Sequence, residues 1–345
     1  MKQNAPMLCG YLSDWGWHGI TPQAAACLTH INYSFALVVD GAVSDAHWSH
    51  AADLDAAIKA FPNLSFILSI GGWGAGGFSE AASTGEGRRR FAETAVDVLR
   101  RHGFSGLDID WEYPCRSDAG IASSPDDRKN FTLLLQTLRE ALDAEESVTG
   151  KHLLLTIAVG SGAYFARDME CDKLNGILDY INLMTYDMAA PDCVTHHCSL
   201  YPSDAYTCGW SADQAVKAYT AAGISRDKLI IGGAFYGHSY EVQAEMPLGQ
   251  TENFKKVHNI DYTRILRDCT EENGYHRYYD DAAHAPYLYN GTRIVVYDDA
   301  QSLSEKVKYV MEYGLAGLMF WEFNGDRTGT LVRVLRDTAD MYKDK

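Results

Sequence analysis

One segment of eleven residues, FSGLDIDWEYP at positions 104–114, restricts the possible folds of the chain more than any other. Three carboxylates, Asp108, Asp110 and Glu112, alternate in it with apolar residues. Because successive side chains of a β-strand point to opposite faces, this period of two places the three acids on one face and the apolar residues on the other. An isolated strand would leave the acidic face in water, whereas a strand covered on both sides would bury it.

Eight short apolar runs occur along the chain, and segments with helical periodicity separate them. The runs lie at residues 7–13, 30–38, 64–70, 104–112, 153–160, 180–186, 228–236 and 314–323. Residues 87–103 and 126–146 have apolar positions at i, i+3, i+4 and i+7, which is typical of helices that cover a sheet. Eight units of strand and helix predict the α/β fold of a closed (β/α)8 TIM barrel. An open doubly wound sheet is the alternative, but no glycine-rich phosphate loop follows the first strand.

The interval between the seventh and eighth runs, from Tyr236 to Gly314, is much longer than the loop and single helix that a barrel requires there. It contains strand-like pieces and many aromatic residues. We therefore predict a small α+β subdomain at residues 238–293, inserted between strand 7 and helix 7. The barrel would then consist of residues 1–237 and 294–345.

In such a barrel the acidic strand is covered on both faces, by helices outside and by the other strands inside. Leu107, Ile109 and Trp111 suit the helix side, so the carboxylates are expected to point inward. Buried carboxylates are unfavourable unless they are hydrogen-bonded, paired or protonated. Since enzymes with this fold have their active sites at the carboxyl ends of the strands, the segment predicts a catalytic site there.

The segment SGLDIDWEYP resembles the D-x-x-D-x-D-x-E signature on the fourth barrel strand of family-18 glycoside hydrolases, the chitinases and their relatives. Further segments resemble motifs of this family in the expected order: LSIGGW (68–73), LMTYD (183–187) and GLMFWEFNGD (317–326). The interval 238–293 resembles the chitinase insertion domain. Two departures are visible: Ser105 replaces the first Asp of the signature, and Ala234 and His238 stand where relatives often have Pro and Arg.

The resemblance implies a hydrolase that cleaves β-1,4 bonds between N-acetylglucosamine residues of chitin or chito-oligosaccharides without any cofactor. The mechanism would be retaining and substrate-assisted, with the 2-acetamido oxygen of the sugar as nucleophile and an oxazolinium intermediate. Glu112 would act as acid and base, and Asp110 would bind the acetamido N–H. Asp108 would share a proton with Asp110. Tyr186 would hold the acetamido oxygen.

The resemblance also implies a set of substrate-binding residues around this centre. Trp321 would form the floor beneath the −1 sugar, Trp73 would stack on the +1 sugar, and Asp187 would bond a sugar hydroxyl. Further substrate contacts are expected from Tyr11, Tyr113, Phe35, Met184 and Tyr236. Tyr11, Ser69 and Ser105 are expected to support the carboxylates, although packing alone would also account for Tyr11 and Ser69.

The charge and the termini restrict the possible partners. With a formal net charge of −16 over 345 residues, the chain is unsuited to nucleic acid or anionic lipid as a partner. No apolar run approaches the roughly 20 residues that a membrane helix needs. The first residues show no secretory leader, so the chain is cytoplasmic as it stands, or secreted if a leader has been removed. A monomer is expected.

The eight cysteines show no compact disulfide spacing and are expected to be reduced. The densest group, from Cys193 to Cys208, includes His196 and His197, but its spacings fit no zinc finger or knuckle. No metal site is therefore predicted.

Two other functions stay open. An endo-β-N-acetylglucosaminidase acting on glycoprotein glycans would share the carboxylates, and a non-catalytic chitin-binding lectin would share the fold. Glu112, which lectins of this family typically lack, argues for an enzyme. Trp73 and the inserted subdomain favour a chitinase over the glycan-cleaving enzyme.

Overall fold

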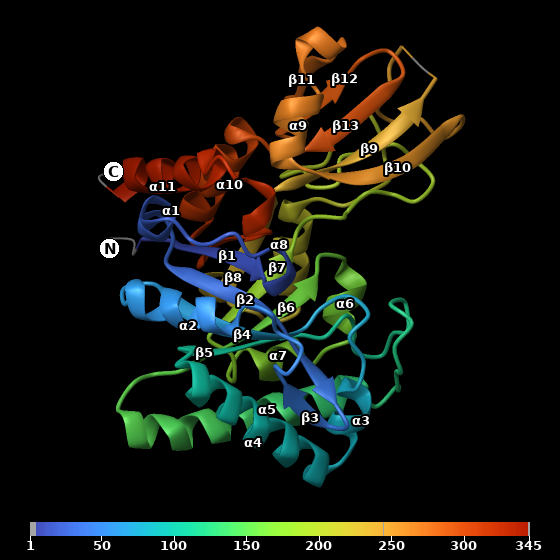
Figure 1. Ribbon diagram of the computed structural model, residues 1–345. Coiled ribbons are helices and arrows are strands. Elements are labelled where there is room, and N and C mark those ends of the chain that lie inside the picture. The colour runs from blue at the N-terminus through green and yellow to red at the C-terminus, as the bar shows by residue number, and fades with distance from the viewer. Residues whose placement is uncertain (1–4, 244, 344–345) are drawn as a thin grey trace.

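In the computed structural model, which describes residues 5–243 and 245–343, eight parallel strands form a closed barrel (Figure 1). The strands are β1 (Met7–Ser13), β2 (His30–Val39), β4 (Ser65–Gly71), β5 (Gly106–Asp110), β6 (Leu154–Gly160), β7 (Tyr180–Met184), β8 (Leu229–Ala234) and β14 (Gly317–Trp321). β1 pairs with both β2 and β14, so the first and last strands close the sheet. A short strand, β3 (Ala42–Ser44), pairs antiparallel with β2. This arrangement confirms the predicted (β/α)8 TIM barrel.

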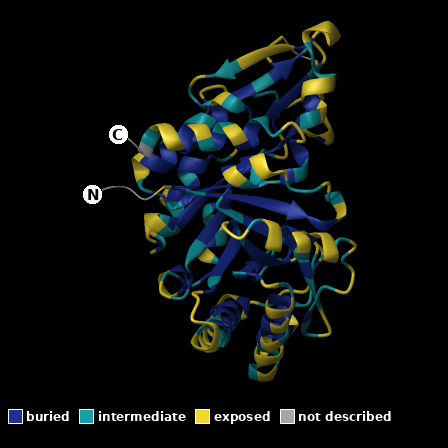
Figure 2. Ribbon diagram, turned by 60° about the vertical axis from the view of Figure 1, so that its left-hand side comes forward, coloured by how far each residue is buried: buried dark blue, intermediate teal, exposed yellow. Residues whose placement is uncertain are grey.

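Helices surround the barrel. They are α1 (Pro22–Cys27), α2 (Ala51–Ala60), α3 (Phe78–Ser83), α4 (Gly85–His102), α5 (Asp127–Thr149), α6 (Ala163–Arg167), α7 (Cys171–Leu174), α8 (Ala212–Ala221), α10 (Ala300–Tyr313) and α11 (Thr330–Lys343). Thr84 caps α4 by accepting the Gly87 N–H, and Gly103 ends it at φ +80°. Figure 2 shows dark strands inside and helices that alternate between buried and exposed residues, so one stripe of each helix covers the sheet. None of the described helices is long and apolar enough to cross a membrane.

The strand that carries the acids, β5, is buried along its whole length. It is shorter than predicted, because it ends at Asp110 and leaves Trp111 and Glu112 in the segment that follows. Trp111 packs against two phenylalanines, with ring centroids 5.4 Å from Phe78 of α3 and 5.4 Å from Phe131 of α5. The apolar side of the segment thus faces the helices, and its acids face the barrel interior.

A second sheet lies beside the barrel, at the top of Figure 1. Its five antiparallel strands have the order β10 (Phe254–Asp261), β9 (Tyr236–Val242), β13 (Arg293–Tyr297), β12 (Ala285–Tyr289) and β11 (His276–Asp280), and α9 (Tyr262–Asp268) packs on it. The predicted insertion, residues 238–293, lies within the span of this sheet. Because β9 follows β8 after a single residue, the sheet is held close to the carboxyl ends of the barrel strands.

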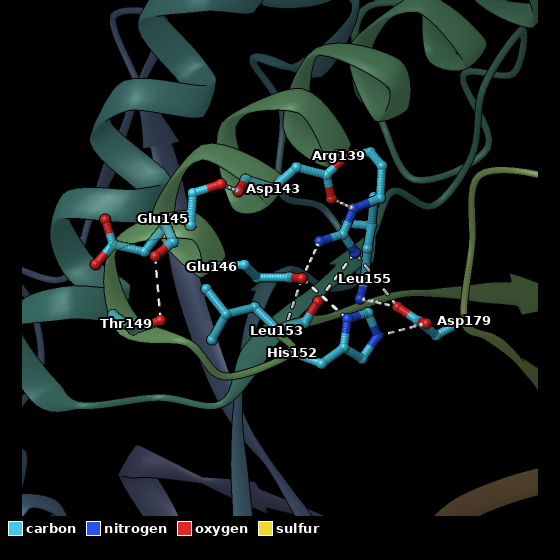
Figure 3. Close-up of polar contacts among 10 residues, drawn as sticks. Arg139, Asp143, Glu145, Glu146, Thr149, His152, Leu153, Leu155 and Asp179 are labelled. Carbon is cyan, nitrogen blue, oxygen red and sulfur yellow. Dashed lines mark hydrogen bonds and ion pairs between the residues drawn. The ribbon is translucent and has the colours of Figure 1, made fainter.

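Charged residues join α5 to β6 and β7 at the opposite, amino-terminal end of the barrel (Figure 3). Arg139 of α5 pairs with Glu146 and donates to the carbonyl oxygen of Leu153, directly before β6. Asp179, directly before β7, accepts the Leu155 N–H at 2.8 Å and lies 2.9 Å from His152. These contacts satisfy backbone groups at the strand starts, which is a structural role.

A buried ion pair connects α10, the second sheet and the barrel. Lys306 of α10 donates to Asp298 at 2.5 Å, and both side chains are fully buried. Asp298, directly after β13, also accepts the Ser302 hydroxyl and the N–H of Ala234 in β8. Because these three donors come from α10 and the barrel, the carboxylate fixes the end of the second sheet against both.

Lys306→Met is expected to lower the free energy of unfolding by about 3–5 kcal/mol, because it leaves a buried carboxylate without its cation. Lys308→Met is the matched control on the same helix, since Lys308 pairs with Glu305 at the surface with 37% of its side chain exposed. Its expected loss is below about 1 kcal/mol. Urea denaturation measures both, and equal losses would contradict a special role for the buried pair.

Candidate active site

The three acids of the β5 segment become progressively more accessible along the chain. Asp108 is fully buried, Asp110 is 4% exposed, and Glu112 is partly buried at the barrel mouth. Their environments differ in the same order: Asp108 is surrounded by hydrogen-bond donors, whereas Glu112 lines an open groove. The three carboxyls are therefore chemically distinct.

Asp108 accepts four hydrogen bonds inside the barrel. Its Oδ2 accepts the hydroxyls of Tyr11 at 2.9 Å and Ser69 at 2.8 Å. Its Oδ1 accepts the Thr156 hydroxyl at 2.6 Å and the Asn182 amide at 3.1 Å. Burial nevertheless raises the pKa of Asp108, while the four donors oppose that shift. The sequence predicts Tyr11 and Ser69 beside the carboxylates but does not indicate Thr156 or Asn182.

Asp110 has the opposite environment, because its Oδ1 is buried without a hydrogen-bond partner. Burial raises the pKa of Asp110 well above its usual range, and the charges of Glu112 and then Asp108 raise it further. These shifts favour the protonated, neutral form of the carboxyl. No hydrogen bond joins it to Asp108 in the described part of the chain, so proton sharing between the two stays a prediction. Asp110 lines the groove, where a ligand can supply the missing partner.

Glu112 combines partial burial with access to the groove. Burial raises its pKa to about 7; a hydrogen bond with the Tyr113 side chain lowers the pKa, and the charge of Asp187 raises it. At neutral pH the carboxyl is thus divided between its acid and base forms. A group of this kind can donate a proton in one step and accept one in the next.

The acids open into a groove of about 1530 Å³ at the carboxyl ends of the strands. Most of the predicted site residues line it: Tyr11, Phe35, Trp73, Asp110, Glu112, Tyr113, Met184, Tyr186, Asp187 and Trp321. Asp108 and Ser69 lie buried beneath it. Tyr236 is buried against Tyr186, with ring centroids 6.2 Å apart.

Ser105 is not among the four donors to Asp108. It lies directly before β5, where its N–H donates to the Phe66 carbonyl and its own carbonyl accepts the Leu154 N–H. It lies three positions before Asp108 along the extended chain, a distance of about 10 Å. Its described contacts are therefore those of a sheet residue at the amino-terminal end of the barrel.

Aromatic rings form much of the groove surface. Trp321 stacks on Phe35, with centroids 5.7 Å apart and 14° between the planes, and Tyr11 lies 5.9 Å from it. Trp73, beyond the end of β4, is 65% exposed. Trp15, to which the sequence motifs assign no role, is also 65% exposed, and its ring centroid lies 6.2 Å from that of Trp321. Flat apolar surfaces of this kind suit the apolar faces of sugar rings.

Tyr186 supplies a hydroxyl next to the acids. Burial raises the pKa of Tyr186 well above its usual range, and the charges of Asp110 and Glu112 add to the shift. The hydroxyl therefore stays protonated. It contacts the Met319 sulfur at 3.8 Å, a weak acceptor that leaves the proton available to a ligand.

Asp187, His197 and His238 bring possible metal-ligand atoms within 4.8 Å of one another. Two features argue against a cation there. The imidazole rings are stacked, with centroids 4.1 Å apart and 17° between the planes, so one ion would lie out of the plane of both lone pairs. The Lys256 ammonium lies 3.4 Å from Nε2 of His238 and would repel a cation. The geometry therefore assigns these residues no metal.

Four residues of this region are not predicted from the sequence. Thr156 and Asn182 are single polar residues in apolar strands, and that is the signal that could have identified them. His238 and Lys256 belong to the second sheet, whose approach to the groove no local pattern indicates.

Acids held inside a TIM barrel beneath an aromatic groove are the arrangement of a glycoside hydrolase. The family described as "Glycosyl hydrolases family 18" matches residues 7–326, and the chain belongs to this family. The resemblance inferred from the sequence motifs is thereby confirmed.

Relatives agree with this assignment. The chain is 38% identical to Chitinase A1 of Niallia circulans over an alignment of 301 positions, which covers 81% of this chain and 43% of that relative. It is 31% identical to Chitinase 1 of Aphanocladium album over an alignment of 366 positions, which covers 93% of this chain and 82% of that relative. A solved family-18 N-acetylglucosaminidase from Paenibacillus barengoltzii is 39% identical, with a TM-score of 0.93 over 96% of this chain and 99% of that one. The chain thus spans less than half the length of Chitinase A1.

Glu112→Gln is expected to change the free energy of unfolding more favourably at pH 8 than at pH 4. In the unfolded chain Glu112 ionises near pH 4.5, but in the folded protein it ionises near pH 7. The wild type therefore loses stability as the pH rises between these values, by about 3 kcal/mol, and Gln carries no such penalty.

Thermal denaturation of both proteins at pH 4 and pH 8 measures this difference. Glu93→Gln, exposed on α4, is the matched control and is expected to have the same effect at both pH values. A Glu112→Gln effect that does not change with pH would contradict the raised pKa.

Proposed function

We propose that this protein hydrolyses β-1,4 bonds between N-acetylglucosamine residues of chitin or chito-oligosaccharides. One observation carries the proposal: Asp110, which has a buried Oδ1 without a hydrogen-bond partner and a raised pKa, precedes by two residues an acid whose pKa is about 7. The aromatic groove supplies the surface that binds the sugars. The relatives named as chitinases support the same substrate class.

The positions of the acids favour a substrate-assisted mechanism. A conventional retaining glycosidase has two carboxyls about 5–5.5 Å apart on opposite sides of the bond that it cleaves. Asp110 and Glu112 belong to one strand segment, two residues apart, and approach the groove from the same side. The nucleophile is then the carbonyl oxygen of the substrate's own 2-acetamido group, which attacks the anomeric carbon and forms an oxazolinium ion.

Glu112 performs both proton transfers. Its acid form protonates the leaving glycosidic oxygen, and the resulting carboxylate takes a proton from the water that opens the oxazolinium ring. A pKa near 7 suits both steps, because neither form is strongly disfavoured at neutral pH. Configuration at the anomeric carbon is retained.

Asp110 and Tyr186 orient the acetamido group. Oδ1 of Asp110 accepts the acetamido N–H and gains the partner that it lacks. Positive charge that develops on the ring favours the ionised form of Asp110, whose proton the neighbouring carboxylates share. The Tyr186 hydroxyl donates to the acetamido oxygen and directs it at the anomeric carbon.

The groove residues hold the sugars on either side of the bond. Trp321 lies under the −1 sugar, Trp73 stacks on the +1 sugar, and Asp187 accepts a sugar hydroxyl. The described lining also includes His238, Tyr240, Phe254, Lys256 and Asn259 from the second sheet. We therefore propose that residues 238–293 act as an insertion subdomain that forms one wall of the groove on the barrel of residues 1–237 and 294–345.

Release of single N-acetylglucosamine units from a chain end is a second candidate. Three lining residues, Tyr11, Phe35 and Trp321, come from β1, β2 and β14, whereas most of the others come from the loops after β4 to β7 and from the second sheet. Such uneven lining favours a short binding region on one side of the cleavage point. The similarity to a structure described as an N-acetylglucosaminidase agrees with this possibility.

Incubation with N-acetylglucosamine oligomers of four to six units tests the main proposal. The wild type is expected to release mainly disaccharide, and Glu112→Gln to lose about 10²–10⁴-fold in kcat while still binding the oligomers. Glu241→Gln, exposed on β9, is the control and is expected to keep wild-type activity. Binding without cleavage by the wild type would indicate a lectin, and monosaccharide as the main product would favour the second candidate.

The acetamido group of the substrate is expected to be indispensable. Fully deacetylated oligomers of the same length lack the nucleophile, so their cleavage should be undetectable, whereas acetylated oligomers first release the β-anomer. Proton NMR during the first minutes of the reaction distinguishes the anomers. Release of the α-anomer, or efficient cleavage of deacetylated oligomers, would contradict a substrate-assisted mechanism.

A further inference from the structure

Asp187 reaches the groove from the end of β7, and a histidine of the second sheet holds it there. Nε2 of His238, on β9, lies 2.6 Å from Oδ1 of Asp187. The Asp187 side chain is 56% exposed, whereas that of His238 is 2% exposed. A buried donor thus fixes a carboxylate that faces the substrate.

The surroundings of His238 leave its ring little freedom. One face stacks on His197, with centroids 4.1 Å apart. Its Nδ1 lies 3.4 Å from the Tyr240 hydroxyl, and Lys256 lies 3.4 Å from its Nε2. The ionisable groups around it are therefore Asp187, His197, Tyr236, Tyr240 and Lys256, from the β7 loop, β9 and β10.

His197 holds the backbone of the same residue. Its Nδ1 accepts the Asp187 N–H at 3.4 Å. Burial lowers the pKa of His197 well below its usual range, so the ring is neutral and able to accept. Asp187 has φ +54°, a conformation that few residues other than glycine adopt. Two stacked histidines thus restrain both the backbone and the carboxylate of Asp187.

The charge of Asp187 reaches the reacting acid. Burial raises the pKa of Asp187, but the hydrogen bond and charge of His238, the Tyr236 hydroxyl and the charge of Lys256 together lower it by more. The net shift is downward and the carboxylate stays ionised. That charge is one of the factors that raise the pKa of Glu112. The contact between His238 and Asp187 is therefore linked to the protonation of Glu112.

We propose that His238 is a positioning residue, which holds the Asp187 carboxylate in one orientation against the sugar bound in the groove. The inference rests on the proposed function and adds to it the source of this orientation, which is the second sheet. His238 does not touch the reacting atoms itself. Its effect passes through Asp187.

Kinetics on the tetramer of N-acetylglucosamine test this role with His238→Phe, which keeps a ring to stack on His197 but removes the donor. The expected loss in kcat/KM is about tenfold to a hundredfold, the factor that corresponds to one hydrogen bond to a charged group. In the Asp187→Asn background the same change should cost less than about threefold, because the partner is already absent. His238→Arg, which again supplies a donor at this position, should retain most of the wild-type kcat/KM.

His276→Phe is the matched control, because His276 is exposed on β11 of the same sheet; it should keep wild-type kinetics. A merely structural role of His238 predicts equal losses with and without Asp187, so additive effects would overturn the proposal. Unchanged kinetics in His238→Phe would overturn it as well.

A measurement without substrate separates this proposal from the proposed function. NMR titration of carboxyl-labelled Asp187 should show a higher pKa in His238→Phe than in the wild type, because the largest of the contributions that oppose burial is removed. If the wild type cleaves no oligomer, the proposed function fails, and the titration still decides whether His238 holds Asp187. An unchanged Asp187 pKa overturns the positioning role.

Discussion

The structure depends on one constraint: a carboxylate inside a barrel must either find enough hydrogen-bond donors or give up its charge. Asp108 meets it in the first way, with four donors around it. Asp110 tends to the second, because burial and the charges of Glu112 and Asp108 raise its pKa. Glu112, at the edge of the groove, lies between these limits. The three acids of one short segment thereby differ in both hydrogen bonding and pKa.

The fold and the centre of the site follow from the sequence because their signals are local. Alternation over residues 104–114 suffices to assign the two faces of the strand, and Trp111 packs on the helix side as that alternation requires. Eight apolar runs separated by helical segments suffice for the barrel. Errors are confined to strand ends, as at β5, where the chain leaves the sheet after Asp110.

The remaining features are not local, and the sequence alone does not reveal them. Thr156 lies opposite Asp108 only because of the register between β5 and β6, which no single strand encodes. His238 and Asp187 are 51 residues apart in the sequence. They come into contact because the second sheet lies close to the carboxyl ends of the barrel strands. The second sheet is thus part of the groove as well as an addition to the fold, because its His238 contacts Asp187.

The four donors to Asp108 also determine when the centre can form during folding. They come from β1, β4, β6 and β7 and lie 97, 39, 48 and 74 residues from it along the chain. Contacts of such long range are made late, after the loss of chain entropy has been compensated elsewhere. A chain in which the barrel is not yet closed therefore holds an acid without its donors, so the centre cannot form before β1, β4, β6 and β7 have come together around β5.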